Sequence, residues 1–193
     1  WTQNPMAAML WEFESLFAHQ KMNLKEFNNL VDLFFYKVAK ENPNADFLEW
    51  LNPKNKKKYT WEKTSISIQK LAKVLKDNIA EGDRCLLVSE NRPEWLIADL
   101  AIMLAGGITV PAYTTYTEKD YKYLVEDCEP SIIIVSNDEM HSKLKNIIKE
   151  KDFIKKVISF DEIKNINKKY KYLSFDSIIN TDLNENEKIK NKN

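Results

Sequence analysis

Four short, uninterrupted apolar runs, separated by segments of helical pattern, constrain the fold of this chain more than any other feature. A continuous apolar run of roughly four to eight residues is typical of a strand buried on both faces. Parallel strands need long crossover connections, and helices supply them. The sequence therefore predicts an α/β fold, a parallel sheet with flanking helices that is built from right-handed βαβ crossovers. The four predicted strands are RCLLVS at 84–89, ITVPA at 108–112, SIIIVS at 131–136 and KKVISF at 155–160.

Apolar residues at helical spacing predict a helix after each of the first three strands. The first of these helices has Pro93 in its first turn and Gly106 at its end, and it is apolar around most of its circumference, so other elements should cover it. In the next one, Thr117 and Asp120 have the spacing of a capping box, and Cys128 is expected to face inward. The predicted helices are ENRPEWLIADLAIMLAGG at 90–107, TEKDYKYLVEDCEP at 117–130 and NDEMHSKLKNIIKEK at 137–151.

Two further helical patterns lie near the N-terminus. MAAMLWEFESLF at 6–17 has acidic residues and few basic ones, which favours a docked or frayed terminal helix over a helix on a membrane surface. NLKEFNNLVDLFFYKVAKENP at 23–43 predicts a second helix, which Pro43 stops. Its core-facing stripe is expected to consist of Leu24, Phe27, Val31, Phe34, Phe35 and Val38.

A hairpin is predicted at residues 46–61, at the edge of the sheet, because aromatic and apolar residues flank a polar turn at 52–58. The lysines of that turn favour a solvated hairpin tip over a nucleic-acid contact, since they form one short run without interleaved aromatic residues. A helix then begins between Thr60 and Ser65, and Gly82 lies just beyond its end. Its inner face is expected to hold Ile68, Leu71, Ala72, Leu75 and Ile79.

Charge and cysteine content limit which partners and which cellular compartment we expect for this chain. The 193 residues include 29 Lys and Arg and 29 Asp and Glu, so no global field attracts nucleic acid or an anionic membrane. Cys85 and Cys128 lie in or beside apolar segments, which is typical of buried, reduced thiols in the cytoplasm. No apolar stretch reaches the roughly 18 to 20 residues of a membrane span, and no secretion signal is present. Peripheral contact with a membrane stays open.

Several common catalytic motifs are absent from the sequence. The only glycines are Gly82, Gly106 and Gly107, so there is neither a GxGxxG turn nor a GxxxxGK[ST] loop, and the chain has no phosphate loop of its own. We expect Gly106 to end the buried helix and Gly107 to allow a tight reversal into the next strand. No GxSxG elbow surrounds any serine. His19 and His141 lack metal-ligand spacing to the cysteines, which favours surface or helix histidines over a metal site.

Two loops at the carboxyl ends of predicted strands are the candidate ligand-binding segments, since ligands of open parallel sheets bind at that edge. They are SENRPEW at 89–95 and AYTTYTEKD at 112–120. The second gathers the hydroxyl groups of Tyr113, Thr114, Tyr116 and Thr117 in front of a helix N-terminus. A well-capped junction with a surface tyrosine explains the same residues without any ligand, so both interpretations stay open.

The segment GDRCLLVSENRPEWLIADLAIMLAGGITVPAYTTYTEKDYKYLVEDCEPSIIIVS at 82–136 resembles the first half of the N-terminal domain of adenylate-forming, or AMP-binding, enzymes. Weaker similarity extends back to about Leu24 and forward to YLSFDSII at 172–179. SENRPEW and GGITVPAYTT resemble the long-chain acyl-CoA synthetases more than the acetate, aryl or peptide-synthetase branches. The fold that this resemblance implies is the N-terminal part of the large domain of an adenylate-forming ligase.

The resemblance implies a long-chain fatty acid:CoA ligase that uses ATP, Mg²⁺ and coenzyme A. In that family a carboxylate attacks the α-phosphate of ATP, and the thiol of coenzyme A then displaces AMP from the acyl-adenylate. The Ser/Thr/Gly-rich phosphate loop of the family does not occur in this sequence, and neither does the lysine of its C-terminal domain. The chain therefore resembles an N-terminal fragment, inactive alone, in which residues 1–21 are an extension and residues 22–193 belong to the AMP-binding domain, ahead of that loop.

One binding role follows from the resemblance. In related ligases the loop after the GGITV-like strand borders the coenzyme A entrance, which assigns Tyr113, Thr114 and Thr115 to it. This chain has threonines where relatives have small residues, so a backbone role is favoured over a side-chain role. Two alternatives remain: a standalone flavodoxin-like binding or regulatory domain, and a CoA ligase for another carboxylic acid.

Overall fold

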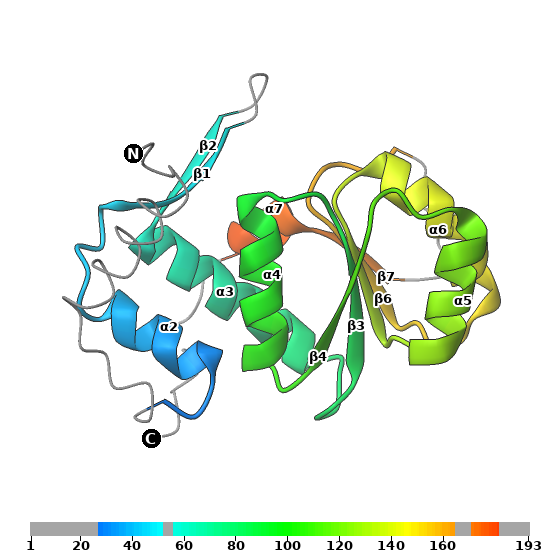
Figure 1. Ribbon diagram of the computed structural model, residues 1–193, viewed down its shortest axis with the longest axis horizontal. Helices are drawn as coiled ribbons and strands as arrows, with labels where there is room; N and C mark the ends of the chain where they lie inside the picture. The colour runs from blue at the N-terminus through cyan, green and yellow to red at the C-terminus, as the bar shows by residue number, and fades with distance from the viewer. Residues whose placement is uncertain (1–26, 52–55, 165–170, 182–193) are drawn as a thin grey trace, which may run out of the picture.

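Five parallel strands, flanked on both faces by helices, form the centre of the computed structural model, which describes residues 27–51, 56–164 and 171–181 (Figure 1). The four predicted strands are confirmed, and the strand order is β4-β3-β5-β6-β7. Every neighbouring pair in this sheet is parallel. The strands are β3 (Arg84–Val88), β4 (Ile108–Ala112), β5 (Ile132–Val135), β6 (Lys156–Ser159) and β7 (Lys171–Ser174).

β7 was not predicted as a strand. It carries no continuous apolar run, and its residues are exposed or only half-buried beside β6 at one edge of the sheet. β4, at the other edge, is also mostly exposed or half-buried, although its sequence is an apolar run. The short helix α7 (Phe175–Ile179) follows β7 directly and buries Phe175 and Ile178. The apolar island at 172–179 is therefore an edge strand joined to one turn of helix.

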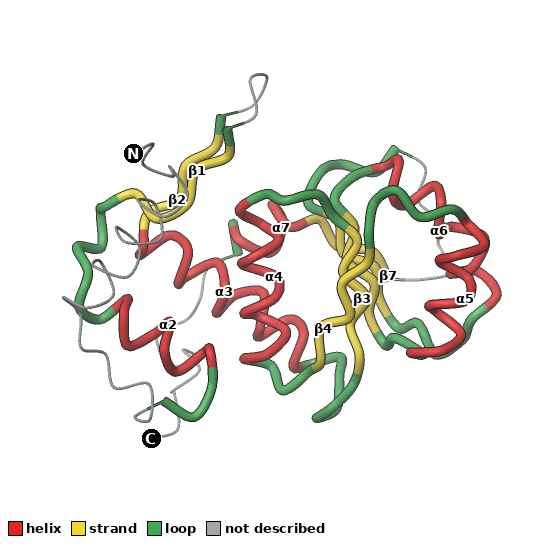
Figure 2. Tube along the Cα trace, viewed as in Figure 1, coloured by secondary structure: helices red, strands yellow, loops and turns green. Residues whose placement is uncertain are grey.

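Helices cover both faces of the sheet, as Figure 2 shows from the side. α3 (Trp61–Lys76), α4 (Pro93–Leu104) and α7 lie on one face, and α5 (Glu118–Cys128) and α6 (Asp138–Glu150) lie on the other. Alternate strand residues supply the two cores: Cys85 and Leu87 pack in the first, Leu86 and Val88 in the second. All four side chains are fully buried, which explains the continuous apolar runs in the sequence.

The second N-terminal helix is shorter than predicted. α2 (Leu30–Val38) begins after Asn29, whose side chain accepts a hydrogen bond from the N–H of Asp32 at 2.9 Å. The helix ends at Val38, five residues before Pro43, and the carbonyl of Pro43 accepts a hydrogen bond from the N–H of Glu62, at 3.1 Å, in the first turn of α3. Val31 and Phe34 are buried as predicted. The expected helix at 6–17 and residue Leu24 lie outside the described residues.

The hairpin is confirmed, and it forms a two-stranded sheet of its own. β1 (Asp46–Trp50) and β2 (Lys57–Thr60) pair antiparallel, and together they extend away from the body (Figure 1). Phe47 stacks on Trp61 with 3.9 Å between ring centroids, so the base of the hairpin is anchored on the start of α3. Residues 52–55 of the predicted turn lie outside the described part of the chain.

Glycine is required at positions 106 and 107 for two different structural reasons. Gly106 has φ +87°, a left-handed conformation that favours glycine, and it follows the end of α4 as predicted. A Cβ on Gly107 would lie 2.9 Å from Cδ1 of Ile79 and 3.2 Å from the carbonyl oxygen of Asp83. Close packing, rather than an unusual backbone conformation, therefore requires glycine at position 107.

The cysteines and His141 differ in part from expectation. Both cysteines are free, and burial raises the pKa of Cys85 to about 12. Cys128 is only half-buried, because it is the last residue of α5 and lies near the surface. His141 is on a helix as expected, but it is buried, and burial lowers its pKa.

Candidate functional site

A pocket of about 440 Å³ lies where β3 and β4 end. The two strands are neighbours in register, with Val88 opposite Ala112, so the loops that follow them leave the sheet side by side. This is the edge at which open parallel sheets bind ligands. Residues that line the pocket are Ser89, Glu90 and Asn91 of the β3–α4 loop, Trp95 of α4, Pro111 and Ala112 at the end of β4, and Tyr113 and Thr114 after it.

The structure places two of the three predicted binding residues on this pocket. Tyr113 and Thr114 line it, and the side chain of Tyr113 is 72% exposed. Thr115 is exposed and is not part of the lining. Thr117 caps α5 by the predicted capping box with Asp120, so that residue has a structural explanation. The capped junction and the pocket therefore exist together.

The turn at Tyr113 is held by hydrogen bonds to two successive carbonyl groups. The N–H of Tyr116 and the hydroxyl of Tyr121 both donate to the carbonyl oxygen of Tyr113, at 3.2 and 2.7 Å. The ammonium of Lys143 donates to the carbonyl oxygen of Thr114 at 2.8 Å. Residues of α5 and α6 thus fix the backbone that forms one wall of the pocket.

Charge limits what the pocket can bind. Among the described residues that line it, none is basic, and Glu90 adds a carboxylate. A phosphate group bound here would therefore have no cationic side chain to pair with. Most of the wall is apolar, and hydroxyl, amide and indole groups supply polar atoms that suit neutral polar ligand groups.

A buried ion cluster lies beside the pocket, around Arg92 of the β3–α4 loop. The guanidinium of Arg92 makes a bidentate pair with Asp161, with both N···O distances 2.9 Å, and its Nε donates to Glu94 at 2.8 Å. It also lies over the ring of Trp50, 4.4 Å from the centroid. Asp161 follows β6, so the Arg92–Asp161 pair crosses the carboxyl end of β5, the strand between β3 and β6.

Glu94 connects this cluster to the hairpin. Its side chain is fully buried and accepts hydrogen bonds from Lys57 at 2.9 Å and from the hydroxyl of Tyr59 at 3.1 Å. Burial acts to raise the pKa of Glu94, but the hydrogen bonds from Arg92 and Lys57 outweigh it and lower the pKa to about 2. Burial also acts to lower the pKa of Arg92, and its bonds to Asp161 and Glu94 raise it instead. Glu94 and Arg92 are therefore both charged at neutral pH.

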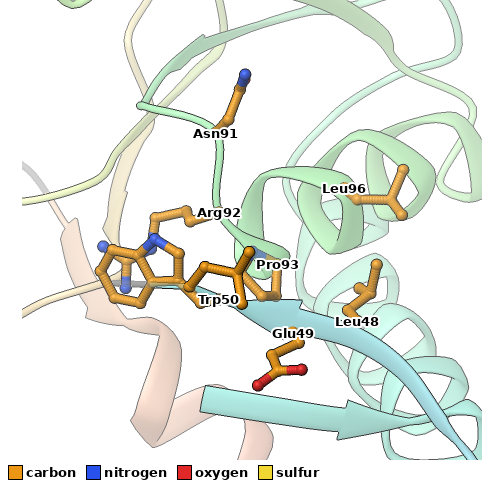
Figure 3. A pocket seen from close by; sticks show the side chains of 8 residues that line it. Leu48, Glu49, Trp50, Asn91, Arg92, Pro93 and Leu96 are labelled. Carbon is orange, nitrogen blue, oxygen red and sulfur yellow. The ribbon is translucent and has the colours of Figure 1, made fainter. Parts of the chain in front are cut away.

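A second, more open pocket of about 620 Å³ lies between the hairpin and the start of α4 (Figure 3). Leu48 and Trp50 come from β1, and Pro93 and Leu96 come from α4. Asn91 lines both pockets, so the β3–α4 loop is the wall between them.

Sequence reasoning missed the ion cluster. Alternating charges at Glu90, Arg92 and Glu94 directly after a buried strand were the available signal, because charged residues are rarely fully buried unless they are paired. The sequence could not have indicated that Lys57 and Asp161 join the cluster. Lys57 lies 37 residues before Glu94, and Asp161 lies 69 residues after Arg92.

The described part of the chain holds neither a metal-ligand cluster nor a membrane-spanning helix. Within residues 27–51, 56–164 and 171–181, no group of three or more His, Cys, Asp or Glu side chains is arranged to hold a metal ion. None of the described helices is long and apolar enough to cross a membrane.

Comparisons with known proteins agree with the fold. A family model described as AMP-binding enzyme matches residues 35–191. The long-chain-fatty-acid–CoA ligase ACSBG1 of Rattus norvegicus is 28% identical over 138 residues, which are 68% of this chain and 18% of that protein. The mitochondrial acyl-coenzyme A synthetase ACSM3 of Homo sapiens is 25% identical over 149 residues, 70% of this chain and 25% of that protein.

A solved structure has the same fold. The anthranilate CoA ligase AuaEII, in complex with anthranoyl-AMP, matches with a TM-score of 0.68 and 21% identity, over 82% of this chain and 29% of that one. The chain thus spans between about a fifth and a third of the length of these proteins. The family model covers far more than half of the residues printed here, and the chain belongs to the AMP-binding enzyme family.

Proposed function

We propose that the whole protein is an ATP-dependent acid–thiol ligase that converts a long-chain fatty acid into its coenzyme A thioester. A fatty-acid carboxylate oxygen attacks the α-phosphorus of ATP, and pyrophosphate leaves as the acyl-adenylate forms. The sulfur of coenzyme A then attacks the acyl carbon, AMP leaves, and the thiol proton is released. The match of the AMP-binding enzyme model to residues 35–191 carries this proposal.

Residues 22–193 would form the N-terminal portion of the adenylation domain, and residues 1–21 an extension before it. Since the sequence has no glycine-rich phosphate loop, ATP and Mg²⁺ would be held by parts of the whole protein other than this chain. The role of the chain is then to complete the sheet and to supply one wall of the coenzyme A entrance.

Tyr113, Thr114 and Thr115 are the proposed entrance residues for coenzyme A. Their position after β4 supports the assignment, since two of them line the pocket at the strand ends. The wall is mostly apolar and has no basic side chain, so it suits the uncharged arm of coenzyme A better than its phosphates.

Long-chain specificity is the finer part of the proposal. SENRPEW and GGITVPAYTT support it, and one relative is a long-chain-fatty-acid–CoA ligase. Another relative is an acyl-coenzyme A synthetase, and the similar structure is an anthranilate CoA ligase.

We place the protein in the cytoplasm, with small-molecule substrates and no nucleic-acid partner. Sedimentation with vesicles would measure any peripheral membrane contact.

An activity assay of the whole protein tests the proposal. With ATP, Mg²⁺ and coenzyme A, palmitate should release pyrophosphate and yield palmitoyl-CoA by mass spectrometry, with higher kcat/KM than octanoate or anthranilate. A preference for octanoate or anthranilate would contradict the long-chain substrate that we propose. Absence of an acyl-adenylate with every acid would refute the proposed ligase activity. The 193-residue chain alone should form no acyl-adenylate.

The strand order supports one alternative from another class. Numbered from β3, the order β4-β3-β5-β6-β7 is 2-1-3-4-5, which is the flavodoxin-like order, with its ligand crevice between the first and third strands. Here the Arg92–Asp161 pair crosses the end of β5, beside that crevice. A standalone domain would melt cooperatively and would not bind hydrophobic dyes, whereas a part of a larger domain should bind such dyes and aggregate.

A further inference from the structure

Two side chains behind the entrance turn donate hydrogen bonds to its backbone without lining the pocket. Tyr121, on the first turn of α5, reaches the carbonyl oxygen of Tyr113. Lys143, on α6, reaches the carbonyl oxygen of Thr114, 29 residues before it in the chain. Two successive carbonyl groups of the turn therefore accept hydrogen bonds from side chains of the helices behind it.

Tyr121 is a dependable donor. Its side chain is fully buried, and burial raises its pKa to about 12, so the hydroxyl keeps its proton over the physiological range. Its ring packs edge-on against Tyr116, 5.8 Å between centroids, and Tyr116 packs in the same way against Tyr113 at 5.5 Å. This row of rings holds Tyr121 in position, so little side-chain freedom is lost when the hydrogen bond forms.

Lys143 is fixed from its other side. Its ammonium lies 3.8 Å from the carboxylate of Glu139, one helical turn away, and 30% of its side chain is exposed. A charged donor makes a stronger hydrogen bond to a carbonyl than a neutral donor does. Lys143 therefore attaches the turn to α6, an element that has no other role in the pocket.

We propose that Tyr121 and Lys143 are positioning residues for thioester formation, which hold the Tyr113–Tyr116 turn in the conformation that admits coenzyme A. This inference rests on the proposed function, because it assigns the turn to the coenzyme A entrance. The two residues act through the turn backbone. Their loss should therefore weaken the step that uses coenzyme A and spare the step that does not.

Kinetics of the two half-reactions in the whole protein test this inference. Tyr121→Phe and Lys143→Met each remove one donor and keep the apolar part of the side chain. Each should raise the KM for coenzyme A about fivefold, the effect of one hydrogen bond, while carboxylate-dependent ATP–pyrophosphate exchange changes less than about twofold. Lys143→Arg keeps a charged donor and should restore most of the affinity.

Matched controls come from the same helices. Tyr123 of α5 is 72% exposed, and Lys145 of α6 is exposed, so Tyr123→Phe and Lys145→Met should leave both half-reactions unchanged. Amide hydrogen exchange adds a ligand-free readout, because loss of either donor should speed exchange at the N–H of Tyr116, which bonds to Tyr113.

The outcomes separate this inference from the proposed function. Absence of ATP–pyrophosphate exchange with every acid in the unmodified protein would refute both. Normal exchange with an unchanged KM for coenzyme A in both variants would refute the positioning role alone. Equal losses in both half-reactions would also refute it, since they would indicate general destabilisation.

Discussion

Arg92 lies between three carboxylates and two aromatic rings, and its side chain is fully buried. Such a cluster need not add net stability, because removing charges from water is costly. Loss of Arg92 is a different matter, since it leaves the carboxylate of Glu94 charged and fully buried. The cluster therefore makes the fold sensitive to single substitutions at Arg92 and Glu94.

Arg92→Met should lower the free energy of unfolding by about 3 kcal/mol, because it leaves the buried carboxylate of Glu94 without its closest guanidinium. Urea denaturation of the whole protein measures the change. Arg84 is the only other arginine, and its Nε donates one hydrogen bond to the carbonyl of Cys128 at 2.7 Å. Arg84→Met should cost about 1 kcal/mol, and equal losses in the two variants would contradict the argument.

Glu94 should also give the stability a specific pH dependence. Its folded-state pKa of about 2 is lower than the ordinary 4.5, so the unfolded chain binds its proton first as the pH falls. The stabilisation is complete above about pH 5 and should be lost between about pH 4.5 and 2, with a slope of up to about 1.4 kcal/mol per pH unit from this group. Urea denaturation at pH 6, 4 and 3 tests this. The free energy of unfolding should fall less steeply with pH in Glu94→Gln than in the unmodified protein. Parallel pH dependences of the two proteins would refute the argument.

At the scale of elements, the helices and strands that could be predicted from the sequence are those marked by a capping residue or by a pattern of core-facing apolar residues. The three central strands, β3, β5 and β6, were predictable because burial on both faces leaves a continuous apolar run. β4 has an apolar run too, although it is an edge strand and most of its residues are exposed or half-buried. β7 was not predictable, because its residues form no such run, and the end of α2 at Val38, five residues before Pro43, was not predicted either. Predictions of local origin, such as the Thr117 cap, were confirmed.

Thr117→Ala tests that cap. Its hydroxyl accepts a hydrogen bond from the N–H of Asp120 and donates one to the carboxylate of the same residue at 2.7 Å. Removal should lower the free energy of unfolding by about 1 kcal/mol, measured by thermal or urea denaturation. Thr115→Ala removes an exposed hydroxyl two residues earlier and should change little; a loss as large as that of Thr117→Ala would show that the cap is not the cause.

At the scale of the whole molecule, the hairpin is attached to the body by side chains that are far apart in the sequence. The strand-end pocket could be predicted from the sequence, because parallel strands bring their carboxyl ends to one edge. The cluster of Lys57, Glu94, Arg92 and Asp161 could not, because nothing local indicates which charges will meet once the hairpin lies beside α4. The position of Thr115 outside the lining likewise depends on the exact path of the turn.

A double-mutant cycle on Lys57 and Glu94 would measure how strongly the hairpin is coupled to α4. The ammonium of Lys57 lies 2.9 Å from the fully buried carboxylate of Glu94, so Lys57→Met, Glu94→Gln and the double variant should give a coupling energy of about 1 kcal/mol or more. Lys58 and Asp46, 2.6 Å apart, are both more than half exposed and belong to the hairpin alone. Their cycle should give a coupling close to zero, because solvent screens the pair. Equal coupling in the two cycles would mean that the buried contact with Glu94 does not hold the hairpin against the sheet domain.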